Sequence, residues 1–72
     1  MNKKNKIKII VNGKQMTVKL KFSLKNLVDK LKLPIGRVAI ELNRQIINKK
    51  NISRVLLKTG DKIEVVHFIG GG

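Results

Sequence analysis

Apolar and polar residues alternate along the first third of the chain. In residues 6–22, KIKIIVNGKQMTVKLKF, apolar side chains recur at every second position on both sides of Asn12-Gly13. A period of two places one set of side chains on a buried face and the other in solvent, as in a half-buried β-strand. Asn12 and Gly13 both tolerate the positive φ that a type I′ turn requires. The segment therefore predicts a β-hairpin.

The spacing becomes helical in residues 23–34, SLKNLVDKLKLP. Ser23 is a suitable N-cap, and Pro34 cannot continue a helix. The pattern predicts a helix of about nine residues. Four apolar residues fall at i, i+3, i+4 and i+7 and form its buried stripe: Leu24, Leu27, Val28 and Leu31.

The second half predicts further strands. Residues 38, 40 and 42 alternate inward, and Asn43-Arg44 forms a plausible tight turn into residues 45–47. Residues 51–57 read as irregular or as one short helical turn. Gly60-Asp61 then marks a turn before the last strand, in residues 62–68.

The predicted order is β-β-α-β-β-β. It gives an α+β fold in which a mixed sheet of about five strands is covered on one face by a single helix. We expect one domain over residues 1–69 and a flexible C-terminal glycine tail over residues 70–72. The helix stripe is expected to pack on apolar residues of the sheet: Ile7, Ile9, Val18, Leu20, Val38, Ile40, Ile63 and Val65.

Composition excludes several classes of function. A chain of 72 residues has no room for a deep active site between two lobes. The absence of cysteine rules out disulfides and thiolate metal sites, and one histidine with four acids argues against any protein-made metal site. No apolar run approaches the roughly 18 residues of a membrane span. The first ten residues are too polar for a secretory signal, so we expect a cytoplasmic protein.

The net charge of +13 has two interpretations. It can mark a polyanionic partner, such as nucleic acid or an acidic protein surface. It can also reflect a genome rich in A and T, which favours the codons of Lys, Asn and Ile together. Most lysines alternate with apolar residues, as on solvated strand faces. This favours the compositional interpretation, although the charge can still steer encounters with an acidic partner.

The chain ends on Gly70, Gly71 and Gly72, directly after the last predicted strand. A segment without side chains is flexible in solution and narrow when extended, so it can thread a tunnel that excludes bulkier peptides. An uncrowded carboxylate at its tip can attack the α-phosphate of a nucleotide and form an acyl-adenylate. In this interpretation the protein is a carrier, and the catalytic groups lie on its partners. The alternative is a frayed terminus.

Several segments together resemble the ThiS family, the ubiquitin-like β-grasp sulfur carriers of thiamine biosynthesis. The most specific are VAIELN, residues 38–43, and VVHFIGGG, residues 65–72, and the resemblance extends over residues 6–72. It implies that Gly72 is adenylated by a ubiquitin-activating-like adenylyltransferase, which uses ATP, while this chain binds no cofactor itself. A sulfur donor such as a cysteine desulfurase would convert Gly72 to a thiocarboxylate, and thiazole synthase would receive the sulfur. The high positive charge departs from the family pattern and leaves the partner surface open.

Three features of the last strand bear on partners. If Ile63 points into the core, Val66 and Phe68 point out beside the tail and suit docking to the partners. His67 falls on the core side, where a half-buried strand histidine is favoured over a proton donor. Three basic residues form either a rim for acidic partner groups or a solvated face: Arg54, Lys58 and Lys62.

Two other functions remain open. Sister carriers, the small subunit of molybdopterin synthase and the tRNA-thiolating ubiquitin-like modifier, share the fold and the terminal glycines. A small basic RNA-binding module is the second, because residues 36–65 faintly echo such domains. However, Phe22 and Phe68 offer little for base stacking, and RNA binding leaves the glycine tail unexplained. An enzyme is the least supported class, since no nucleophile, metal spacing or phosphate-binding loop is evident.

Overall fold

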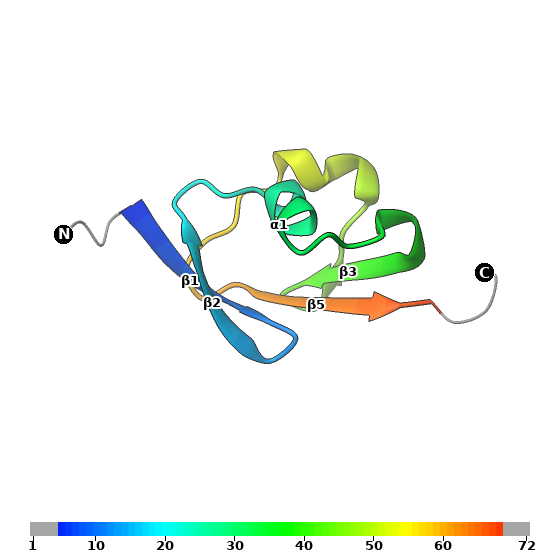
Figure 1. Cartoon of the computed structure of the whole chain (residues 1–72), viewed down its shortest axis with the longest axis horizontal. Helices are drawn as coiled ribbons and strands as arrows, with labels where there is room; N and C mark the ends of the chain where they lie inside the picture. The colour runs from blue at the N-terminus through cyan, green and yellow to red at the C-terminus, as the bar shows by residue number, and fades with distance from the viewer. Residues whose placement is uncertain (1–4, 69–72) are drawn as a thin grey trace.

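A computed structural model describes residues 5–68 of the chain. Five strands form one sheet in the order β2-β1-β5-β3-β4, with helix α1 across one face (Figure 1). β1 and β5 run parallel, and the other neighbouring strands are antiparallel, so the sheet is mixed as expected. The elements in chain order are β1 (Lys6–Val11), β2 (Lys14–Lys19), α1 (Leu24–Lys30), the 3₁₀ helix η2 (Ile35–Arg37), β3 (Val38–Leu42), β4 (Gln45–Ile46), the 3₁₀ helix η3 (Lys49–Arg54) and β5 (Lys62–His67).

Both predicted tight turns are confirmed, and both begin with an asparagine at positive φ. Asn12 has a φ of 48° and Asn43 a φ of 50°, and the residue after each is also at positive φ, as in type I′ turns. The side chain of each asparagine also forms a hydrogen bond with the backbone of β5, the central strand of the sheet. The Asn12 Oδ1 accepts a hydrogen bond from the Val65 N–H at 2.8 Å, and the Asn43 Oδ1 accepts one from the Lys62 N–H at 2.9 Å.

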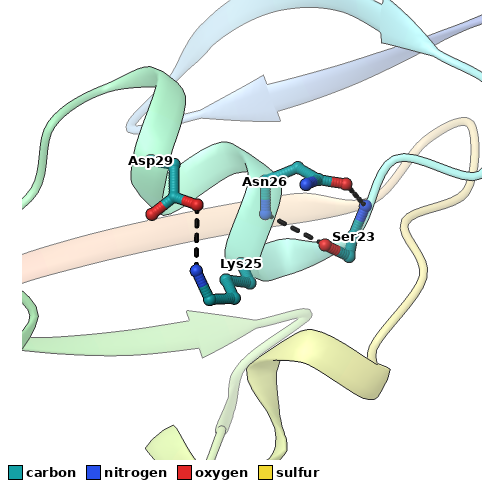
Figure 2. Close-up of polar contacts among 4 residues, drawn as sticks. All are labelled: Ser23, Lys25, Asn26 and Asp29. Atoms are coloured by element: carbon teal, nitrogen blue, oxygen red, sulfur yellow. Dashed lines mark hydrogen bonds and ion pairs between the residues drawn. The ribbon is translucent and has the colours of Figure 1, made fainter.

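Helix α1 begins with a capping box (Figure 2). The Ser23 Oγ accepts a hydrogen bond from the Asn26 N–H, and the Asn26 Oδ1 accepts one from the Ser23 N–H, both at 2.9 Å. This satisfies two donors that the first turn would otherwise leave free. An exposed Lys25–Asp29 ion pair at 3.0 Å spans one turn of the helix. The helix has seven residues, slightly fewer than expected, because Leu31 is its C-cap.

The core lies between α1 and the sheet. Leu24 and Leu27 are fully buried, and residues from four strands pack around them: Ile7, Ile9, Val18, Val38, Ile40 and Ile63. Two residues expected in the core are instead exposed. Leu20 follows the last residue of β2 in a turn, and Leu31 lies where the chain leaves the helix, so neither continues the buried stripe. Ile52 and Leu57 close the core instead. They come from the segment expected to be irregular or one short helical turn, and the 3₁₀ helix η3 confirms the helical turn in its first part.

Candidate docking surface and tail exit

The last described residues are tied firmly to the sheet. β5 lies between β1 and β3, and its end pairs with the start of β3, Ala39 opposite Val66 and Val38 opposite His67. The Phe68 N–H then donates to the Arg37 carbonyl oxygen at 2.9 Å, which extends the backbone pairing one residue beyond the strand. The direction in which the chain leaves the domain is therefore fixed up to Phe68.

Val66 and Phe68 are both exposed, as expected from the sequence. Each keeps about half of its surface accessible, 50% for Val66 and 51% for Phe68. Ile63 is buried on the helix side, so the alternation along β5 places Val66 on the opposite face. Lys49 of η3 holds its ammonium 5.5 Å from the centre of the Phe68 ring, a cation–π geometry. Two exposed apolar side chains therefore lie at the exit of the tail.

His67 differs from the expectation of a half-buried residue. It lies on the helix side of β5 opposite Val38, but its side chain is exposed. Its partner Val38 is the first residue of β3, so His67 lies at the end of this strand pair. His67 is accessible beside the tail exit.

The basic residues proposed as a rim do not gather at this exit. Lys58 lies in the turn before β5 and Lys62 at its first residue, so both are at the end of the strand remote from Phe68. Arg54 is exposed at the end of η3. The exit is contacted instead by the ammonium of Lys49 and by the backbone carbonyl oxygen of Arg37. Sequence reasoning missed them because these contacts join segments distant in the chain, and no local pattern signals them.

Gly70, Gly71 and Gly72 lie outside the described residues, so their predicted roles are not tested by the geometry. Between residues 5 and 68, no three His, Cys, Asp or Glu side chains come together as a metal site. Over the same range, no helix is long and apolar enough to cross a membrane.

Comparison with known proteins identifies the family. The ThiS family model matches residues 9–72, which includes the glycine tail. The sulfur carrier protein ThiS of Bacillus subtilis is 36% identical over 63 residues, which cover 86% of this chain and 96% of that protein. A thiazole synthase of Paramagnetospirillum magneticum is 33% identical over 66 residues, or 92% of this chain. The chain spans only 20% of the length of that enzyme.

A solved structure has the same fold. The thiamine biosynthesis protein (ThiS) of Geobacter metallireducens superposes with a TM-score of 0.81 at 30% sequence identity. The match covers 92% of this chain and 100% of the neighbour. The expected ubiquitin-like β-grasp fold is thereby confirmed. Together with the family model, which extends through the last glycine, it shows that the chain belongs to the ThiS family.

Proposed function

We propose that this protein is a sulfur carrier for the thiazole ring of thiamine. The observation that carries the proposal is the match to the ThiS family over residues 9–72, because it includes both the β-grasp domain and the three glycines. Gly72 is the residue that is activated and loaded with sulfur. Residues 1–69 form the domain that partners recognise, and residues 70–72 form the tail that enters their active sites.

The chemistry proposed for the tail needs only a carboxylate on this chain. An oxygen of the Gly72 carboxylate attacks the α-phosphorus of ATP on a ubiquitin-activating-like adenylyltransferase, and pyrophosphate leaves. The terminal sulfur of a donor's cysteine persulfide, such as that of a cysteine desulfurase, then attacks the acyl carbon, and AMP leaves. A further thiol reduces the S–S bond of the resulting acyl disulfide, which frees the tail as a thiocarboxylate and leaves the donor thiol in a disulfide. The resulting thiocarboxylate gives its sulfur to thiazole synthase. The ATP and the catalytic groups belong to the partners, so this chain acts as a carrier rather than an enzyme. We place these reactions in the cytoplasm.

The three glycines suit a narrow channel. Gly70 and Gly71 add no side chain beyond the backbone, so they can pass where a β-carbon would collide. The hydrogen bond between Phe68 and Arg37 supports this role, since it aims the tail from a fixed point. We propose that Val66 and Phe68 dock against the activating enzyme and thiazole synthase, because a partner that receives the tail approaches this end of β5.

Two tail variants test the proposal. Gly71→Trp and an added alanine after Gly72 are expected to abolish AMP-forming activation by the purified adenylyltransferase. Both should melt at the wild-type temperature, since neither changes the described domain. Lys50→Ala, an exposed substitution in η3, is the matched control and should be activated normally. An extended tail that still accepts sulfur would refute the mechanism.

A further inference from the structure

Strand β2 has a free edge, because it is the outermost strand on its side of the sheet. On the neighbouring strand, the Ile10 N–H donates to the carbonyl oxygen of the residue before β5 at 2.9 Å, so the backbone groups of Ile10 face β5. Gln15 lies opposite Ile10 in the hairpin, and its N–H and C=O groups therefore point away from β1. The same holds for Thr17, two residues further along. No turn, loop or side chain within residues 5–68 forms a hydrogen bond with these backbone groups.

Two open hollows follow this edge, between β2 and the end of α1. The hollow at the hairpin end, of about 270 Å³, is lined by Val11, Lys14, Gln15, Met16 and Leu31. The hollow at the other end of β2, of about 350 Å³, is lined by Lys6, Thr17, Val18, Lys19, Phe22 and Lys30. Met16 and Val18 share the helix side of β2 and lie about 7 Å apart, so the hollows are neighbours along the strand. We call the free edge and the two hollows the β2 groove.

The β2 groove combines an apolar floor with a basic border. Its charged side chains are Lys6, Lys14, Lys19 and Lys30. The acid closest to it in the chain is Asp29 on α1, whose carboxylate is held by Lys25 at 3.0 Å. The other acidic side chains belong to β3, to β5 or to the turn before β5, and β1 stands between those strands and β2. No acidic side chain within residues 5–68 therefore neutralises the lysines of the groove.

We propose that the β2 groove binds an extended, acidic peptide segment of a partner protein as an added strand. The free backbone groups of Gln15 and Thr17 pair with the backbone of the segment, since an unpaired strand edge is a template for a further strand. Apolar side chains at every second position of the segment rest on Met16, Val18 and Leu31. Acidic side chains at its ends meet the lysines of the groove.

Charge and shape favour this occupant over two others. A second copy paired along the same edge brings Lys14 and Lys19 against the same lysines of its partner, and each chain carries a net charge of +13. RNA matches the lysines, but it has no amide edge to pair with Gln15 and Thr17, and Phe22 is the one aromatic ring in the groove. An acidic peptide uses the free edge, the apolar floor and the basic border together.

The proposal does not depend on the proposed function. β1 separates the free edge from β5, the strand that leads to the C-terminal tail. A segment bound along β2 therefore holds the domain at an edge that the tail does not use.

Three synthetic peptides test the proposal by fluorescence anisotropy. The first alternates valine and threonine and carries two glutamates at each end. The second carries lysines at its ends instead, and the third has prolines in place of the threonines, which prevents strand pairing. At about 0.15 M salt, where long-range attraction is screened, we expect the first peptide to bind at least tenfold more tightly than either of the others.

A matched pair of charge reversals locates the binding site. Lys30→Glu changes the border of the groove, and Lys50→Glu makes the same change in net charge at an exposed residue of η3. We expect Lys30→Glu to weaken binding of the acidic peptide about fivefold and Lys50→Glu to weaken it less than twofold. Hydrogen exchange of the wild-type protein gives a readout without a variant: the acidic peptide should slow exchange of the Thr17 N–H at least tenfold.

Four results would overturn the proposal. The first is equal binding of the acidic and the lysine-ended peptide, and the second is an equal loss in Lys30→Glu and Lys50→Glu. In the third, the acidic peptide binds without slowing exchange at Thr17, which would leave charge attraction alone. In the fourth, oligouridine binds and the acidic peptide does not, which would assign the lysines to RNA. A protein that dimerises in sedimentation equilibrium, with the Thr17 N–H protected in the absence of peptide, would assign the edge to a second copy and also refute it.

Discussion

Replacing Asn43 separates two ways in which one turn residue supports the central strand. Its Oδ1 accepts a hydrogen bond from the Lys62 N–H at 2.9 Å, and its Nδ2 donates to the Asp61 Oδ1 at 3.0 Å. The same residue holds a φ of 50°, a conformation that asparagine and glycine adopt more readily than alanine. The side chain therefore joins the β3–β4 turn to the start of β5, and the backbone keeps the turn closed.

Glycine and alanine at this position divide these contributions. Asn43→Gly keeps the backbone conformation and loses two hydrogen bonds, each contributing about 0.5–1.5 kcal/mol, and the lower half applies to these exposed groups. We expect a loss of about 1–2 kcal/mol. Asn43→Ala adds roughly 1 kcal/mol for a β-carbon at positive φ, which gives about 2–3 kcal/mol. A single small domain has about 3–5 kcal/mol of stability, so the alanine variant should be close to unfolding.

Thermal and urea unfolding followed by circular dichroism measure both losses. Each kcal/mol corresponds to about 4–8 °C in a domain of this size, so Asn43→Gly should melt roughly 5–15 °C below wild type. Asn51→Ala is the control, because Asn51 is exposed and its side chain forms no hydrogen bond within the described chain. A glycine variant as stable as wild type would refute the hydrogen-bond contribution. Equal stability of the two Asn43 variants would refute the conformational one.

Three further experiments test other parts of the structure. Ser23→Ala removes the N-cap of α1 and should lower the unfolding free energy by about 1 kcal/mol in urea titrations; no change would contradict the capping box. Lys49→Met removes the cation over the Phe68 ring. A double-mutant cycle with Phe68→Ala should give a coupling free energy of about 0.5 kcal/mol, and a value of zero would mean that the contact does not stabilise the domain. Ile9→Ala opens a cavity in the core and should lower the free energy of unfolding by about 2–5 kcal/mol. Leu20→Ala, at an exposed residue, should lower it by less than about 0.5 kcal/mol, and similar losses for the two variants would show that Leu20 belongs to the core.

Local sequence patterns predicted the elements that depend on local chemistry. Asn12 and Asn43 could be recognised as turn residues because their preference for positive φ is intrinsic. Ser23 could be recognised as a cap because its hydroxyl acts on a residue three positions away. The alternation around Ile63 also placed Val66 on the exposed face correctly, since parity within a strand is local.

Features that depend on where elements end, or on distant contacts, could not be predicted in this way. Leu20 and Leu31 continue the apolar period, but the strand and the helix stop before the period does. Ile52 is buried, but it lies in a segment whose apolar residues follow neither a strand nor a helix period, so its burial could not be predicted. The contact of Lys49 with Phe68 joins residues that are far apart in the chain, so it depends on the packing of the whole domain.

The intact mass of the protein purified from its own cells, under conditions that preserve thiocarboxylates, tests the central claim most directly. Fragmentation locates any change to a residue. We predict a fraction of the protein in which sulfur replaces one oxygen at the C-terminal carboxylate of Gly72, and a larger fraction after incubation with its adenylyltransferase, ATP and a sulfur source. A chain that continues past Gly72, or a Gly72 carboxylate that stays unmodified after that incubation, would contradict the account.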